Sequence, residues 1–343
     1  MSIPSVAVLV AAYNAAATLP RCLDSLCGQT MSNLEIICVD DCSTDVTLEI
    51  LHERANKDTR IKVLQTPRNS GQAVARNLAL QHVQASFICM VDADDWLSLD
   101  ALEKAMDCFR QHPRTDCVMF QLIIHDDTDD HEEDYGLPDK LVKGEALSGN
   151  EAFELCIDGW KLHGLYLTRR SLYQAIPFDT STRLYSDDNT SCLHYLHSRE
   201  VRACTGTYFY RRHLQSLTTS FSPLRFDQME AMLSLLFQLK KEAVQSAILR
   251  RYESHRWMAY IHCYRLFLQH RAELDAQTIL QISARLRTIL HTFRPSRLPL
   301  RSRWKPGYWL MLNTRLFHFQ QQAYLHLWVN GLKKSFKIFP FFY

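Results

Sequence analysis

The chain has 343 residues, enough for one large α/β domain and a smaller appended unit. Hydrophobic residues make up 47% of it and charged residues 22%, a composition that excludes an intrinsically disordered protein. The formal net charge is only +2, but residues 276–343 carry 11 Lys and Arg and no Asp or Glu, so the preceding part is net acidic.

The cysteines and the N-terminus indicate the compartment. The 11 cysteines are scattered and include no CxxC pair that would predict a zinc or redox site. Most lie in apolar runs, where a thiol acts as a small hydrophobe, and this favours a reducing environment. The first residues lack the basic region of a signal peptide, and no segment reaches the roughly 18 uninterrupted apolar residues of a membrane span. We therefore expect a cytoplasmic protein.

The first hundred residues alternate short β-branched runs with amphipathic stretches, the pattern of βα units and a parallel sheet. Polar clusters follow three of the predicted strands, and ligands of open α/β sheets bind outside the carboxyl ends of strands, so we expect the clusters to meet in one crevice. The clusters are Tyr13-Asn14, Asp40-Asp41 and Asp92–Asp95. Strands are predicted over 6–10, 35–39, 61–64 and 87–91, with helices after the caps Thr18 and Asp45 and over 72–83.

Beyond residue 100, a helix is predicted over 101–111 and a strand over 118–124. The run His125–Asp134 is strongly acidic, and a block of like charges is more typical of a solvated, mobile loop than of a metal site. Mixed elements follow from 151 to about 219, and helices from 225, broken into short pieces near the prolines of the basic tail.

Asp92, Asp94 and Asp95 come directly after a buried strand. Carboxylates at such a place suit Mg²⁺ or Mn²⁺, which bridge to diphosphate oxygens and offset the charge of a departing nucleoside diphosphate. The alternative is a helix cap, a role for which Asp95 is the best placed of the three.

Two turns carry groups that suit a nucleotide. The turn Asp40–Asp45 offers oxygens to a base or ribose, the alternative being an ordinary capped turn between strand and helix. The segment Asn69–Asn77 begins a helix whose Arg76 and Asn77 would bring donors toward phosphate or ribose. In the alternative, Arg76 forms a structural ion pair with an acidic loop.

Five segments stand in a characteristic order: Val8–Asn14, Ser25–Thr30, Glu35–Asp45, Asn69–Asn77 and Asp92–Leu97. Over about the first 100 residues this set resembles the family-2 inverting glycosyltransferases of the GT-A fold. A weaker similarity to the same family follows at Tyr185–Asp188, Tyr208–Arg212 and Ser216–Thr218.

The resemblance implies a nucleoside-diphosphate sugar donor, usually uridine-linked, and a single displacement that inverts the anomeric centre. It also implies a metal ion, Mn²⁺ or Mg²⁺, and a role for each matching residue. Asp188 is the catalytic base, Asp94 and Asp95 bind the metal, and Asp187 and Arg211 serve the acceptor or support the site. The implied nucleotide-binding residues are Ala11, Tyr13, Asn14, Asp41, Arg76 and Asp92.

Asp187 and Asp188 are adjacent, so if they begin a helix only one of them can face the sugar, and the helix N-terminus would favour the ionised form of a base. Three departures from the family pattern stand out. Ala11 stands where Pro or Thr is common, Asp187 is one methylene shorter than the usual Glu, and Gly164–Tyr166 lacks the usual Lys. The last segment lies toward the acceptor side, so the acceptor stays open.

The predicted fold class is α/β: a GT-A type nucleotide-binding sheet flanked by helices, with a mainly helical C-terminal region. We place the glycosyltransferase domain at 1–222, with a nucleotide-binding half at 1–100 and an acceptor half at 101–222, and the basic helical region at 223–343. The absence of GxGxxG after the first strand and of a Walker sequence excludes a Rossmann dehydrogenase and a P-loop protein. A nucleotidyltransferase acting on sugar phosphates and a non-catalytic nucleotide-sugar or anionic-polymer binding protein stay open.

The expected partners are a nucleotide-sugar donor and a saccharide or lipid-linked acceptor of cell-surface polysaccharide biosynthesis. The basic residues of the tail are interleaved with Leu, Phe and Trp, a pattern that disfavours nucleic acid. It indicates docking to an anionic membrane surface, peripheral on the inner face of the cell membrane. In the alternative, these aromatic residues pack in the core of a helical subdomain.

Overall fold

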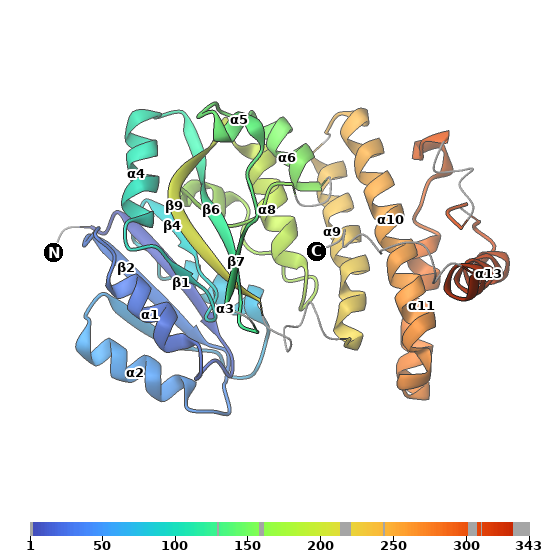
Figure 1. Cartoon of the computed structure of the whole chain (residues 1–343), viewed down its shortest axis with the longest axis horizontal. Helices are drawn as coiled ribbons and strands as arrows, with labels where there is room; N and C mark the ends of the chain where they lie inside the picture. The colour runs from blue at the N-terminus through green and yellow to red at the C-terminus, as the bar shows by residue number, and fades with distance from the viewer. Residues whose placement is uncertain are drawn as a thin grey trace. The chain divides into compact units, whose positions relative to one another are not determined.

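The computed structural model describes residues 3–128, 130–157, 161–212, 221–242, 244–300, 307–309 and 311–331, without the side chains of Ser186 and 327–331. The chain forms two compact units (Figure 1). One comprises Met1–Cys156 and Trp160–Ser220, and the other Ile157–Gly159 and Phe221–Tyr343. The main division thus lies two residues before the boundary expected at 222.

The described part of the first unit is built on one nine-stranded sheet (Figure 1). Its N-terminal half is parallel, in the order β3 (Ile61–Gln65), β2 (Leu34–Asp40), β1 (Val6–Ala12) and β4 (Phe87–Met90). The sheet continues through β8 (Tyr166–Arg169), β6 (Thr115–Asp126), β9 (Glu200–Arg212) and β5 (Trp96–Leu97), while β7 (His131–Asp134) pairs with β6. β8 is antiparallel to both β4 and β6, whereas β6 and β9 are parallel.

Helices cover both faces of the parallel half, which is why β1 and β2 are apolar without alternation. Val6, Val8 and Val10 share one core with α1 (Leu19–Cys27), α2 (Thr47–Lys57) and α4 (Ala101–Gln111). Ala7 and Leu9 point to the opposite face and pack with α3 (Gln72–Leu80). Four further helices belong to the second half of the sequence of this unit: α5 (Asp139–Val142), α6 (Gly149–Ile157), α7 (Arg170–Ala175) and α8 (Ser186–His197).

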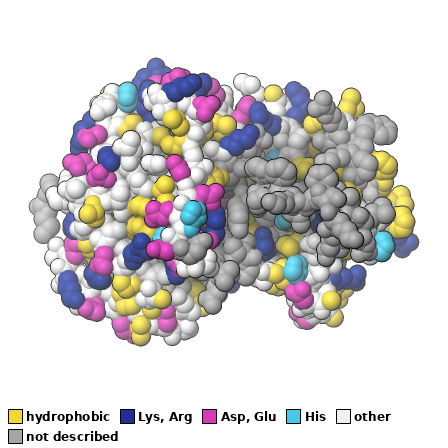
Figure 2. Space-filling view, in the orientation of Figure 1, with side chains coloured by type: hydrophobic (Ala, Val, Ile, Leu, Met, Phe, Trp, Pro, Cys, Tyr) yellow, Lys and Arg dark blue, Asp and Glu magenta, His cyan; other side chains and the backbone are white. Residues whose placement is uncertain are grey.

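The prediction of a mobile loop for the acidic run is wrong, because its described residues form a β-hairpin. β6 continues to Asp126 and pairs antiparallel with β7, and it also pairs in parallel with the end of β9. Arg211 thereby forms an ion pair with Asp127, and Arg212 lies 3.7 Å from a Glu133 oxygen. Figure 2 shows acidic, basic and histidine side chains intermixed over this hairpin. The stabilising cations come from about 80 residues further along the chain, so the local charge pattern did not reveal them.

The second unit is helical in its described residues, with α9 (Asp227–Lys241), α10 (Ser246–His270), α11 (Ala276–Leu290) and α13 (Thr314–Gly331). Short 3₁₀ turns lie at Pro223–Phe226, Arg271–Glu273 and Pro295–Arg297. The core is aromatic: Trp257, Tyr260, Phe293 and Phe317 are buried together. No described helix combines the length and apolar character that crossing a bilayer requires.

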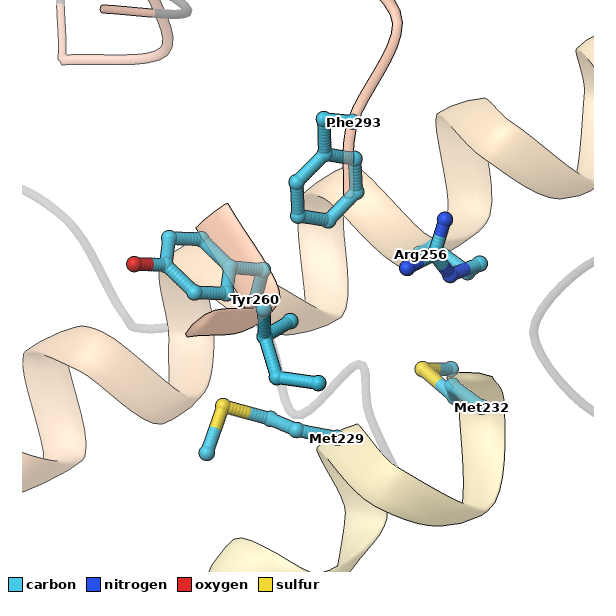
Figure 3. A pocket seen from close by; sticks show the side chains of 6 residues that line it. Met229, Met232, Arg256, Tyr260 and Phe293 are labelled. Atoms are coloured by element: carbon cyan, nitrogen blue, oxygen red, sulfur yellow. The ribbon is translucent and has the colours of Figure 1, made fainter. Parts of the chain in front are cut away.

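One small cavity lies in this core, with room for about one water molecule. Figure 3 shows Arg256 beside it among Met229, Met232, Tyr260 and Phe293. The buried guanidinium is compensated by Glu253 at 2.8 Å and donates to the Thr292 hydroxyl at 2.7 Å. The cavity is therefore a packing defect around a buried ion pair and is too small for an organic ligand.

Candidate active site

The turns after β1 and β2 form one unit at the carboxyl end of the sheet. The Asn14 Oδ1 accepts from the Thr44 N–H at 2.8 Å, and the Asn14 N–H donates to the Ser43 hydroxyl at 3.0 Å. Asn14 and Cys42 both have positive φ, 50° and 60°, a left-handed conformation that is uncommon for residues other than Gly and Asn. Tyr13 stands beside these turns with 47% of its surface exposed, while Ala11 is partly buried within β1.

The Asp41 carboxylate organises the loop before α3. It is buried and accepts from the Thr66 hydroxyl at 2.6 Å, and from the N–H groups of Ser70 at 3.0 Å and Gly71 at 2.7 Å. Gly71 has a φ of 91°, which a side chain would strain. The carboxylate is therefore already occupied in this structure, and the contact with the nucleotide that the resemblance implies for Asp41 stays a prediction.

Asp92, Asp94 and Asp95 form a carboxylate cluster after β4, with one oxygen of each within 4.8 Å of the others. Asp95 is buried and accepts from the Tyr208 hydroxyl at 2.7 Å and the Arg211 N–H at 2.8 Å. Burial, with the charges of Asp94 and Asp92, raises the pKa of Asp95 well above its usual range. Three hard oxygen donors that repel one another fit a divalent cation such as Mg²⁺ or Mn²⁺.

The alternative of a helix cap does not hold for Asp95, because β5 follows it directly and α4 begins only at Ala101. Thr18 stands at the N-cap position of α1, as predicted, but its hydroxyl makes no cap hydrogen bond. It instead donates to the Ala93 carbonyl oxygen at 3.0 Å. Thr18 thus fixes the backbone of the aspartate cluster against the start of α1.

Arg76 joins the carboxylate cluster to α8. Its guanidinium donates to the Asp92 Oδ1 at 2.5 Å and to the Asp187 Oδ2 at 3.2 Å, and the side chain is only 1% exposed. Gln72, one helical turn earlier, donates to the same Asp187 oxygen at 3.0 Å. The ion pair with acidic segments, which the sequence left as an alternative for Arg76, is therefore present.

Asp187 and Asp188 lie in the first turn of α8, as expected, and their surroundings differ. Asp187 is held by Arg76 and Gln72, whereas the half-buried Asp188 carboxylate accepts no hydrogen bond from any residue that the structure describes. Burial and the neighbouring Asp187 raise the pKa of Asp188 well above its usual range, whereas the helix N-terminus was expected to favour the ionised form. A carboxylate with a raised pKa is a stronger base.

Arg211 lies near the C-terminal end of β9, and its backbone supports the carboxylate cluster. Its N–H donates to Asp95, while its side chain pairs with Asp127 of the hairpin. Sequence reasoning missed Gln72 and Tyr208 as site residues. Gln72 shares a helix face with Arg76, a spacing that could have revealed it, whereas nothing in the sequence pairs Tyr208 with Asp95. Ser216–Thr218 lie outside the described residues.

A model of the family described as glycosyl transferase family 2 matches residues 7–181, about half of the chain. The chain belongs to glycosyltransferase family 2. This family-2 chain is 37% identical over 112 residues to an uncharacterized glycosyltransferase of Haemophilus influenzae, a match covering 33% of this chain and 45% of the relative. Two further relatives are proteins of Bacillus subtilis. They are the putative glycosyltransferase EpsH, 31% identical over 238 residues, and the putative teichuronic acid biosynthesis glycosyltransferase TuaG, 40% identical over 104 residues.

The match to EpsH covers 66% of each chain, and the match to TuaG 30% of this chain and 41% of TuaG. The family-2 chain thus spans from about two fifths to two thirds of these relatives.

Two solved structures establish the GT-A fold of this family-2 chain. Staphylococcus aureus TarS 1–349 in complex with UDP-GlcNAc superposes with a TM-score of 0.69 at 18% identity, over 97% of this chain and 94% of TarS 1–349. The mannosyltransferase PcManGT of Pyrobaculum calidifontis, in complex with GDP-Man and Mn²⁺, gives a TM-score of 0.53 at 17% identity, over 96% of this chain and 88% of the other. At such identities the likeness concerns the fold, including the curled central sheet, and the activity has to be argued from the site.

Proposed function

We propose that this chain moves a sugar from a UDP-sugar to a saccharide or lipid-linked acceptor, with inversion, in cell-surface polysaccharide biosynthesis. One observation carries the proposal: Asp188, whose carboxylate has no hydrogen-bond partner among the described residues, directly follows Asp187, which shares Arg76 with Asp92 of the carboxylate cluster. Arg76 therefore lies between the turn that carries Asp188 and the carboxylate cluster, which suits a metal ion. An inverting displacement needs these two sites on opposite sides of the reacting sugar.

The carboxylate cluster and the exposed Tyr13 would hold the donor. Asp94 and Asp95, with Asp92, would bind Mn²⁺ or Mg²⁺, which when bound stabilises the negative charge of the leaving diphosphate. The Tyr13 ring lies beside the Asn14 turn, where a flat apolar surface can stack with a base. The UDP-GlcNAc of TarS and the GDP-Man with Mn²⁺ of PcManGT support this assignment, because both proteins share the fold.

The chemical step would be a single displacement. Asp188 accepts the proton of the acceptor hydroxyl as its oxygen forms a bond to the anomeric carbon, and the bond from that carbon to the diphosphate breaks. UDP leaves with the bonding electron pair, and the product has the opposite anomeric configuration. Because Asp187 is held by Arg76, Asp188 is the carboxylate of the pair that can approach the acceptor.

The acceptor class and the location rest on two further observations. TuaG is named for teichuronic acid biosynthesis, which supports a cell-surface polysaccharide as the acceptor. In the second unit, Trp309, Leu312, Leu316 and Phe319 are exposed, and they belong to a region without acidic residues. We define these four residues as the apolar stripe. Apolar side chains among basic residues suit the interface of an anionic membrane, where we place the protein as a peripheral partner.

Turnover of a panel of UDP-sugars tests the proposal. The purified protein is incubated with each donor and a mixture of mono- and disaccharide acceptors, with Mn²⁺, with Mg²⁺ or with chelator, and released UDP is measured. We expect metal-dependent UDP release with at least one donor, and an inverted anomeric centre in the NMR spectrum of the product.

Variants at the cluster and the base complete this test. Asp94→Ala should abolish metal-dependent turnover, and Asp188→Asn should lower kcat by about 10²- to 10⁴-fold, the usual contribution of a general base. Glu53→Gln removes an exposed carboxylate on α2 and is the matched control, with activity unchanged. Full activity of Asp94→Ala in chelator, or a product that retains the donor's anomeric configuration, would contradict the proposal.

A further inference from the structure

The segment that delivers Asp188 is attached to α3 at both of its ends. At the first end, Asn77 donates to the Phe178 carbonyl at 2.9 Å and accepts from the Phe178 N–H at 3.0 Å. At the second end, Gln72 and Arg76 both donate to Asp187, the residue before Asp188. Between these ends, Tyr185 is held in a left-handed conformation with φ 68°, directly before α8. A strained residue at this place requires surroundings that fix the backbone.

Arg76 is also attached to the other side of the reaction. Its second terminal nitrogen donates to Asp92, whose side chain is one third exposed at the carboxylate cluster. The guanidinium is therefore a rigid spacer between the first turn of α8 and the end of β4. A planar guanidinium can hold two carboxylates at fixed angles, which the single ammonium group of a lysine cannot.

Burial argues against direct contact between Arg76 and a nucleotide. The side chain is 1% exposed, and both terminal nitrogens donate to protein carboxylates. Phe178 covers the guanidinium, its ring centroid 5.4 Å from the central carbon. The Nε of Arg76 makes no hydrogen bond to any described residue but is buried as well, so a ligand could reach the guanidinium only by displacing a residue that covers it.

We propose that Arg76 and Asp187 are positioning residues that fix the distance between Asp188 and the donor-binding carboxylate cluster, with Arg76 acting through Asp187. This inference rests on the proposed glycosyl transfer and adds to it how the base is placed. An error of about 1 Å in such a placement can cost roughly 10²-fold in rate.

A double-mutant cycle tests the proposal. Arg76→Lys, Asp187→Asn and the double variant are compared with the wild type for kcat, for donor KM, and for UDP affinity by calorimetry in the presence of Mn²⁺. We expect each single variant to lose roughly 10- to 100-fold in kcat while UDP affinity changes less than about threefold. The double variant should be no slower than the slower single variant, because both substitutions break the same link.

Two further variants separate positioning from general stability. Asp187→Glu keeps the negative charge that Asp187→Asn removes, and its kcat should lie within about tenfold of the wild type. If Asp187 merely stabilised the fold, Asp187→Asn would leave the kcat of the folded protein unchanged. Gln72→Ala removes the neutral donor to Asp187 and leaves the ion pair, so it should slow kcat less than Arg76→Lys. Thermal midpoints identify any variant that fails to fold, and Glu53→Gln serves as the control.

Each outcome decides the matter. Additive losses in the cycle would overturn the positioning role. A fall in UDP affinity with Arg76→Lys that matches the loss in kcat/KM would also overturn it and would indicate that Arg76 binds the nucleotide. If the positioning role is overturned but the wild type turns over and Asp188→Asn does not, the proposed function still stands. No turnover by the wild type with any donor would overturn the proposed function itself, and this inference with it.

Discussion

Four aspartates of the site have the same side chain and four different environments. Asp41 is saturated by backbone and hydroxyl donors, Asp95 is buried among like charges, Asp187 is paired with a cation, and Asp188 has no hydrogen-bond partner in the described chain. The order of motifs singled out these aspartates as candidate site residues. It could not predict their environments, because the partners are far away in sequence: Thr66 for Asp41, Tyr208 for Asp95 and Arg76 for Asp187.

The environment of Asp188 predicts how activity depends on pH. As the proposed base, Asp188 must be ionised, and its pKa is raised by burial, by Asp187 and by Cys192, with Arg76 acting in the opposite direction. Cys156 on α6 also faces it. Activity is therefore lost as the pH falls through a pKa higher than the roughly 3.9 of an ordinary Asp. The acidic limb in the plot of kcat against pH should therefore lie at a higher pH than an ordinary Asp would give.

Asp187→Asn checks the cause of this shift. It removes the nearest like charge, so the acidic limb of the residual activity should move to lower pH even though its plateau is lower. Rate profiles between about pH 4 and 9 measure both quantities, with Glu53→Gln as the control whose limb stays in place. Coincident limbs in the wild type and Asp187→Asn would mean that another group titrates.

At the scale of elements, hydrophobic periodicity served well wherever contacts are local. The helix over Ala101–Gln111 has the predicted bounds, and the four parallel strands differ from their predictions by at most a few residues. The acidic hairpin was missed because its pairing depends on β9, whose arginines neutralise it. Periodicity describes one element, whereas the charge balance of a strand is set by its neighbours in the sheet.

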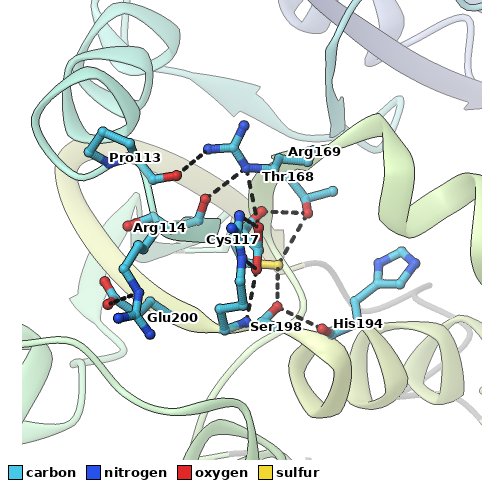
Figure 4. A network of polar contacts seen from close by, with 11 residues as sticks. Pro113, Arg114, Cys117, Thr168, Arg169, His194, Ser198 and Glu200 are labelled. Carbon is cyan, nitrogen blue, oxygen red and sulfur yellow. Dashed lines mark hydrogen bonds and ion pairs between the residues drawn. The ribbon is translucent and has the colours of Figure 1, made fainter.

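A second long-range polar network holds the other end of β6. Asp116 accepts from the N–H and two guanidinium nitrogens of Arg199, at 2.6–2.9 Å, and lies 3.2 Å from Arg169 of β8. In Figure 4, Arg169 also donates to the backbone oxygens of Pro113 and Thr115. The cluster thus joins β6, β8 and the residue before β9.

Asp116→Ala should therefore destabilise the fold. It leaves the Arg199 N–H without its acceptor and the guanidinium groups of Arg199 and Arg169 without this carboxylate, which we expect to cost about 2 kcal/mol, discounted for the exposure of Arg199. Burial raises the pKa of Asp116, but the hydrogen bonds from Arg199 outweigh it and lower the pKa below its usual value. Asp116 therefore makes its full contribution to the free energy of unfolding above about pH 4, and this contribution is lost as the pH falls through the lowered pKa.

Denaturant unfolding at pH 7 and below pH 3 measures this effect. The difference in unfolding free energy between the wild type and Asp116→Ala should be large at pH 7 and smaller in acid. Asp107→Ala, which removes the exposed partner of Arg110, is the matched control and should change stability by less than about 0.5 kcal/mol. A difference that is the same at both pH values would show that Asp116 contributes by packing and not by charge.

At the scale of the whole molecule, the sequence left open how the surface of the second unit is built. The basic tail had two alternatives, membrane docking or packing in its own core, and its described residues combine features of both. Phe317 is fully buried in the aromatic core of the second unit, whereas Phe319, two residues later on α13, is 71% exposed. Composition cannot distinguish two such residues, because the difference depends on which side of α13 meets α10.

The apolar stripe predicts binding to anionic membranes. Leu316 and Phe319 lie three residues apart on α13, with Trp309 and Leu312 shortly before it and the exposed Arg315 between them. Full burial of a Leu or Phe contributes about 1.5–3 kcal/mol, and insertion into the headgroup region gives part of this. Leu316→Gln/Phe319→Gln should therefore weaken partitioning onto vesicles of phosphatidylglycerol and phosphatidylethanolamine by roughly 10- to 100-fold in a sedimentation assay.

A matched control distinguishes the effect of the apolar stripe from that of other exposed apolar side chains. Phe237→Gln/Leu280→Gln also removes one Phe and one Leu, both exposed in the second unit but on α9 and α11, and it should leave partitioning unchanged. Because the basic residues contribute through screened electrostatics, binding of the wild type should fall as salt is raised and be weak on neutral phosphatidylcholine vesicles. Equal losses in the two double variants would show that the stripe is not the anchor. Tight binding of the wild type to neutral vesicles would show that apolar contact, without charge, holds the protein at the membrane.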